Sequence, residues 1–120
     1  MITATLTLLL FTTLAAAHPR CRAIDGDTLA CGASRVRIIG LDAPELRGRC
    51  PAETTLAHQA QARLDHLVAG GITIHPQRRD RYGRTLAVVR DARGRDVAAV
   101  LVREGLARPN HGERRMGWCR

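Results

Sequence analysis

The sequence predicts an α+β fold, because short strand-like stretches alternate with one long amphipathic helix and one short helix. The order along the chain is three strands, a helix, two strands and a second helix. This order is compatible with a five-stranded OB-type β-barrel with two packed helices, and other α+β folds fit it too. A chain of 120 residues is long enough for one domain with one modest core.

The strands are predicted where β-forming residues alternate with polar residues between turn signals. An Asp-Gly pair ending at Gly26 separates the first two strands, and Pro44 follows the third. Within the third strand Val36 and Ile38 alternate with arginines, a pattern typical of a half-buried strand. The predicted strands cover residues 22–25, 28–31, 35–41, 72–75 and 85–90.

The long helix is predicted over residues 51–69, because apolar residues recur there at spacings of three and four. Pro51 suits the first turn, Glu53 suits the helix dipole and Gly70 suits the C-terminal cap. The apolar stripe consists of Leu56, Ala60, Leu64, Leu67 and Val68. A second, short helix is predicted to begin at the N-cap Asp96. Its buried side consists of Val97, Val100 and Leu101.

The chain is strongly basic, with 19 basic against 11 acidic residues and a net charge of +8. Every basic residue is arginine, a side chain that can bind a phosphate through two parallel hydrogen bonds. Such a charge favours a polyanionic partner, either nucleic acid or an anionic membrane surface. Charge alone does not distinguish between these partners.

The first 17 residues carry no charged side chain and include a short apolar stretch over residues 8–14. Three alanines ending at Ala17 form the small-residue pattern at which signal peptidases cleave. We interpret residues 1–17 as a signal peptide and residues 18–120 as the mature domain, which is then secreted or periplasmic. The segment lacks the usual early Lys or Arg, so an uncleaved tail that tethers the protein to a membrane is the alternative.

The four cysteines form no Cys-x-x-Cys pair, which argues against a zinc site. An even number behind an export signal predicts two disulfides, and four buried free thiols in a cytosolic protein are the alternative. Cys21 and Cys31 lie five residues on either side of Gly26, so they face each other across a hairpin that turns there. Elimination then pairs Cys50 with Cys119.

Three clusters of polar residues could carry chemistry, and each has an ordinary structural interpretation when taken alone. Residues 25–28 could form a hairpin turn, residues 37–45 a strand end followed by a turn, and residues 80–84 a charged loop. Taken together, the clusters supply the groups that hydrolysis of a phosphodiester requires.

Hydrolysis of a phosphodiester requires hard oxygen ligands for a divalent cation, a base for the attacking water and fixed cations for the transition state. Asp27 and Asp42 can supply the ligands, Glu45 can act as the base, and Arg37 and Arg84 can provide the cations.

These clusters resemble those of the staphylococcal nuclease (thermonuclease) family in type, order and spacing. The resemblance covers about residues 21–108. The matching stretches are residues 24–28, 37–45, 80–87 and 101–107.

The resemblance implies an OB-type barrel and a Ca²⁺ site with carboxylate ligands Asp27 and Asp42 and the backbone carbonyl of Ala43. It places Asp25 beside that site and makes Glu45 the general base or the residue that positions the attacking water.

For the substrate, the resemblance implies that Arg37 and Arg84 bind the scissile phosphate, with Arg84 also assisting the leaving 5′-oxygen. It also implies that Tyr82 contacts a neighbouring phosphate. The implied activity is Ca²⁺-dependent cleavage of DNA and RNA with little sequence preference, which leaves 3′-phosphates. We expect a monomer, although the sequence itself does not reveal the oligomeric state.

The chain departs from the family pattern at Ala43, after Ala107 and in its four cysteines, which are an addition to that pattern. Ala43 replaces the threonine of the best-known member, a change that preserves the carbonyl ligand. The region after Ala107 is short and lacks the tyrosines that stack on a base in better-known members.

Two other functions are compatible with the sequence. One is a non-catalytic OB-fold module that binds nucleic acid, although Phe11, Tyr82 and Trp118 are the only aromatic residues available for stacking. The other is a basic, secreted protein that binds surfaces and whose acidic residues are structural.

Overall fold

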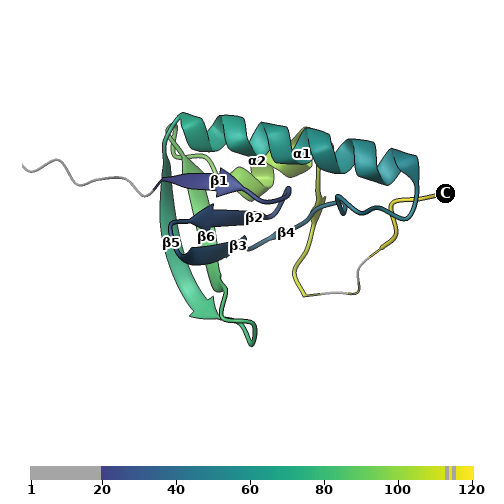
Figure 1. The fold of residues 1–120 in the computed structure, drawn as a ribbon. Helices are drawn as coiled ribbons and strands as arrows, with labels where there is room; N and C mark the ends of the chain where they lie inside the picture. Colours follow the sequence, from purple (N-terminus) through teal and green to yellow (C-terminus); the bar gives the residue numbers. More distant parts are fainter. Residues whose placement is uncertain (1–19, 113, 115) are drawn as a thin grey trace, which may run out of the picture.

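The computed structural model describes residues 20–112, 114 and 116–120, which form an α+β fold (Figure 1). The predicted signal peptide, residues 1–17, lies outside the described residues. The helices are α1 (Pro51–Ala69) and α2 (Val97–Arg103). The strands are β1 (Cys21–Ala23), β2 (Thr28–Cys31), β3 (Ser34–Ile38), β4 (Leu41–Asp42), β5 (Ile72–Arg79), β6 (Thr85–Asp91) and β7 (Arg108–Pro109).

Five of the strands form a mixed sheet in the order β1-β2-β3-β6-β5, and β4 pairs separately with β7. Only β3 and β6 run parallel among the neighbours of the larger sheet. The predicted α+β class is therefore confirmed. The predicted closure into an OB-type barrel is not confirmed, because no ladder joins β1 to β5 within the described chain. With three residues, β1 offers little backbone for such a ladder.

The core lies between one face of the sheet and the two helices. Figure 1 shows α1 running along the β1 side of the sheet, with α2 behind it. Alternate residues of the strands point inward, as the period of two requires. The largest fully buried side chains are aliphatic or proline: Leu29, Ile38, Leu41, Leu64, Leu101, Val89, Val97 and Pro44.

The bounds of α1 agree with the prediction, with Pro51 in the first turn and Gly70 as the C-cap. The buried stripe is shifted from the predicted one. It consists of Glu53, Ala57, Ala60, Leu64 and Leu67, and Leu56 and Val68 are only half-buried. The sequence pattern did not reveal this shift because small alanines, rather than the larger Leu56, face the closely packed chain beneath α1.

The other helix and two strands show smaller differences from the predictions. The carboxylate of Asp96 accepts the Ala98 N–H and caps α2 as expected. The strand predicted over residues 35–41 ends at Ile38, because the chain turns at Gly40 with φ of 96° and resumes as β4. β5 continues beyond the predicted 72–75 to Arg79, paired with β6 through an irregularity between Pro76 and Arg78 that hid its period.

Both predicted disulfides are present. Cys21 and Cys31 are paired in the β1–β2 ladder with Cα atoms 4.1 Å apart. Cys50, the N-cap of α1, is joined to Cys119 with Cα atoms 6.0 Å apart. The second bridge ties the C-terminal segment to the start of α1 (Figure 1). Among the described residues, neither helix has the length and apolar character needed to cross a membrane.

The two disulfides should differ in their contribution to stability. Serine at Cys50 and Cys119, which are 69 residues apart, should lower the free energy of unfolding by about 4 kcal/mol, because the bridge restricts the unfolded chain. Serine at Cys21 and Cys31, which are 10 residues apart, should lower it by about 3 kcal/mol. Urea unfolding of the two double variants measures both values, and a larger loss for the shorter loop would contradict the expectation.

Candidate functional site

The site begins at the loop between β1 and β2, which packs closely against two other segments. A Cβ atom at Gly26 would lie 2.8 Å from the Ala60 Cβ of α1 and 2.9 Å from the Ala43 Cβ. Real Cβ atoms do not approach this closely, so only glycine allows the loop to lie here. This contact places Asp27 against the chain that follows β4.

Asp27 lies in a nearly enclosed position with four neighbours. Its carboxylate accepts the Thr28 hydroxyl at 3.0 Å and the Ala43 N–H at 3.4 Å. The Arg37 guanidinium forms an ion pair with it at 3.3 Å. The neighbouring Asp25 accepts the Asp27 N–H at 3.1 Å.

Burial raises the pKa of Asp27 to about 6. This value is the balance of opposing effects, because the positive charge of Arg37 and the Thr28 hydrogen bond lower the pKa while the charge of Asp25 acts with burial to raise it. The carboxylate is thus compensated only in part by its protein neighbours, as expected of a group that also interacts with a cation.

Of the other predicted metal ligands, Ala43 donates its N–H to Asp27, and Asp42 directly precedes it in the chain. Asp42 and Ala43 are buried, with 5% and 2% of their surface exposed. Two carboxylates and a backbone carbonyl are hard oxygen donors, which suit Ca²⁺. Among the described residues no group of three or more His, Cys, Asp and Glu side chains is placed to hold a metal. A cation at Asp27 and Asp42 would therefore need backbone oxygen and water as further ligands.

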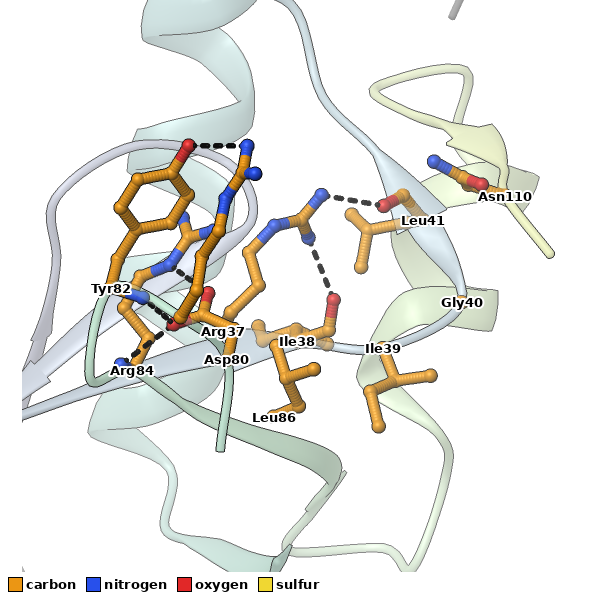
Figure 2. Close-up of a pocket in the computed structure, with 11 residues that line it drawn as sticks. Arg37, Ile38, Ile39, Gly40, Leu41, Asp80, Tyr82, Arg84, Leu86 and Asn110 are labelled. Carbon is orange, nitrogen blue, oxygen red and sulfur yellow. Dashed lines mark hydrogen bonds and ion pairs between the residues drawn. The ribbon is translucent and has the colours of Figure 1, made fainter. Parts of the chain in front are cut away.

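Arg37 is fixed in the break between β3 and β4. Its guanidinium donates to the Ile38 carbonyl at 2.7 Å and to the Leu41 carbonyl at 3.2 Å, across the turn at Gly40 (Figure 2). These bonds and the ion pair with Asp27 leave its side chain 19% exposed. Its orientation is therefore set before any ligand binds.

Arg84 is held by the turn between β5 and β6. Asp80 accepts the N–H groups of Tyr82 and Arg84, both at 2.9 Å, and the Arg84 Nε at 2.7 Å. Partial burial would raise the pKa of Asp80, but the hydrogen bonds from Arg84 and Tyr82 hold it below its usual value. Arg84 also lies over the Tyr82 ring, 5.6 Å from its centroid.

The predicted phosphate-binding residues meet in one cavity of about 320 Å³, whose lining includes Arg37, Tyr82 and Arg84 (Figure 2). The structure thus brings together the predicted substrate-binding residues and, through the ion pair of Arg37, connects them to Asp27. Glu45 does not line this cavity. It lines a separate one of about 180 Å³ together with Arg49, Glu53 and Trp118.

Comparison with known protein families decides what this arrangement represents. Residues 35–116 match the family model described as staphylococcal nuclease homologue. The chain belongs to this family. No curated protein matched the chain. Membership indicates a nuclease or nucleic-acid-binding function with nucleic acid as the ligand.

Two carboxylates that organise this staphylococcal nuclease homologue were not identified as site residues from the sequence. Glu53 is buried and accepts the N–H groups of Glu45 and Arg49, both at 3.1 Å. The sequence could have indicated that Glu53 is buried, because it lies four residues before Ala57 and therefore on the same inner face of α1. The other is Asp80, which the sequence placed in a charged loop and in a matching family stretch without indicating a role for it.

The raised pKa of Asp27 predicts a pH dependence of stability in chelator. The folded protein holds the Asp27 proton up to about pH 6, whereas an aspartate in the unfolded chain has a pKa of 3.8. The proton on Asp27 therefore stabilises the folded protein, and its contribution to the free energy of unfolding is fully present below about pH 4. That contribution is lost as the pH rises through 6. Asp27→Asn should remove this loss, so the free energy of unfolding of the variant relative to wild type should increase across the same interval.

Urea unfolding at several pH values measures this difference, with Asp96→Asn as the control. Asparagine caps helices as well as aspartate does, so the control should retain the wild-type decline. Parallel pH curves for wild type and Asp27→Asn would contradict the assignment.

Proposed function

We propose that this protein is a secreted or periplasmic Ca²⁺-dependent nuclease that hydrolyses DNA and RNA with little sequence specificity. The observation that carries the proposal is the position of Arg37. Its guanidinium forms an ion pair with Asp27 and lines the same cavity as Arg84. One side chain thus connects the candidate metal ligands with the candidate phosphate site.

The two arginines are suited to stabilise the charge that develops on a phosphate during hydrolysis. Each guanidinium is oriented by groups of the protein: backbone carbonyls and Asp27 for Arg37, and Asp80 for Arg84. Preoriented donors need no reorganisation as charge develops, so they lower the barrier rather than only binding the substrate. Asp80 accepts the Nε–H of Arg84, so the terminal nitrogens of this guanidinium would be the donors to a phosphate.

Asp27, Asp42 and the Ala43 carbonyl would hold Ca²⁺ next to these arginines. When bound, the ion would supply positive charge to the phosphate oxygens and lower the pKa of a water molecule. The raised pKa of Asp27 fits this assignment, because the carboxylate lacks full compensation from the protein. Asp25 remains beside the site, where it fixes the Asp27 N–H.

Glu45 is proposed as the general base for the attacking water. Its side chain is exposed, while its backbone is fixed by the hydrogen bond to Glu53 on α1. A base on a fixed backbone with an accessible carboxylate can accept a proton from water. Tyr82 is exposed at the rim of the cavity with Arg37 and would contact a neighbouring phosphate.

A non-catalytic nucleic-acid-binding module is the second candidate. The position of Glu45 favours it, because this carboxylate lines a different cavity from Arg37 and Arg84. Such a module would bind nucleic acid through its arginines without cleaving it.

The extracellular location is supported by the two disulfides, since such bridges persist in oxidising compartments. Together with the predicted signal peptide, they favour a secreted or periplasmic location.

Catalysis is tested with single variants. Arg84→Ala and Glu45→Ala should each lower kcat/KM for a DNA substrate by at least about 100-fold, since each removes a transition-state contact or the base. Arg103→Ala, at an exposed position of α2, should retain wild-type kinetics. If the wild-type protein binds DNA but shows no Ca²⁺-dependent cleavage, the second candidate replaces the first.

The metal site is tested by calorimetry of Ca²⁺ binding. Asp42→Asn should weaken the affinity because one of two carboxylate ligands loses its charge, and Asp96→Asn should leave it unchanged. We also expect poor activity with Mg²⁺, which requires a tighter octahedral set of ligands. Unaltered Ca²⁺ affinity in Asp42→Asn would exclude this residue as a ligand.

A further inference from the structure

The outward face of β1, β2 and β3 carries a row of arginines. Arg22 of β1 is paired with Ala30 of β2, and Ala30 is paired with Arg35 of β3. Paired residues of neighbouring strands project from the same face of a sheet. Arg22 and Arg35 therefore flank the small side chain of Ala30.

These two arginines share a hollow with a third. A cavity of about 380 Å³ is lined by Arg20, Arg22 and Arg35 together with Cys21, Ala30 and Gly32, and no carboxylate lines it. All three arginines are exposed.

The charges in this hollow are not compensated within the described chain. Arg37, Arg63, Arg84 and Arg95 each form an ion pair with a carboxylate. No ion pair or hydrogen bond of the side chains of Arg20, Arg22 and Arg35 occurs among the described residues. Like charges side by side on a sheet are unfavourable, so this arrangement attracts an anion that covers them.

Strand β3 links the hollow to the candidate active site, because Arg35 lines the hollow and Arg37 lines the cavity of that site. Arg35 and Arg37 are two residues apart on this strand, so they project from the same face, about 7 Å apart. The residues of the three strands on the face opposite Leu29 and Val36 are Arg22, Thr28, Ala30, Arg35 and Arg37, of which Thr28 and Ala30 are buried. The positive charge thus extends from the cavity at Arg37 toward the β2–β3 turn.

We propose that Arg20, Arg22 and Arg35 form a second site, which binds backbone phosphates of the nucleic-acid strand that is held at Arg37 and Arg84. This inference rests on the proposed function, because it assumes that the strand occupies the cavity at Arg37. The second site has no aromatic side chain and no carboxylate in its lining, so it binds the phosphate backbone without selecting a base. These phosphate contacts would supply affinity for nucleic acid that the few aromatic residues of this chain cannot supply by stacking on bases.

A pair of double variants tests the second site. Arg22→Gln with Arg35→Gln removes two charges from the hollow. Arg93→Gln with Arg103→Gln removes two exposed charges from the β6–α2 turn and from α2, and serves as the control. The readout is the fluorescence anisotropy of a fluorescein-labelled DNA single strand in chelator, which prevents cleavage, at several salt concentrations.

For a strand of about 20 nucleotides, the slope of log K against log salt should become shallower by about 1.4 in the Arg22/Arg35 variant, because each lost phosphate contact on single-stranded DNA contributes about 0.7. The control should retain the wild-type slope and affinity. Wild type should also bind this strand more tightly than a strand of about four nucleotides, and the Arg22/Arg35 variant should narrow that difference.

An equal loss of affinity in both double variants would overturn the proposal, since net charge alone would then explain binding. A slope in the Arg22/Arg35 variant equal to that of wild type would also overturn the second site. The proposed nuclease function would then still be supported if the wild-type protein cleaves DNA in the presence of Ca²⁺. If the wild-type protein did not cleave DNA but the Arg22/Arg35 variant showed the expected change of slope, the proposed catalytic function would be wrong. The second binding site would still be supported.

Discussion

The ion pair between Asp27 and Arg37 is the contact on which the candidate site depends. A buried carboxylate is unfavourable without compensation, and burial raises the pKa of Asp27 to about 6 although Arg37 lies 3.3 Å away. Arg37 is itself held by two carbonyls in the break after β3. Because the same guanidinium lines the cavity with Arg84, the pair joins the acidic and basic halves of the site. The close packing of Gly26 keeps Asp27 in reach.

The turns at the two ends of β6 share a local motif that fixes an arginine, and the topology determines where each arginine lies. Asp80 and Asp91 each accept two backbone N–H groups at 2.9 Å and the Nε of the arginine four residues later at 2.7 Å. In both turns a glycine with positive φ precedes that arginine. The motif therefore supplies a rigid arginine, and the topology places Arg84 beside Arg37 but Arg95 in a different cavity, beside α1.

The aliphatic core is supplemented by polar and covalent links at its margin. Aromatic residues make up only 2% of the chain, so large buried rings are not available to pack the helices against the sheet. Instead Glu53 holds the backbone of Glu45 and Arg49, and the Cys50–Cys119 bridge fixes the C-terminal segment next to the same loop. These links act on the segment that carries the proposed general base, so stability and geometry depend there on the same residues.

Local sequence was sufficient for the bounds of α1, for the pairing of Cys21 with Cys31 and for the family motifs, because helical periodicity, hairpin symmetry and motif spacing are properties of neighbouring residues. The tertiary structure decided the rest. Examples are the break of the third strand at Gly40, the buried role of Glu53, the open edges of the sheet and the separation of Glu45 from the cavity at Arg37. The break at Gly40, the sheet edges and the position of Glu45 depend on how segments distant in the chain pack, and side-chain size and available space determine which groups meet there. Glu53 acts on residues four and eight positions away, but its role requires the loop before α1 to fold back onto the helix, which helical periodicity does not reveal.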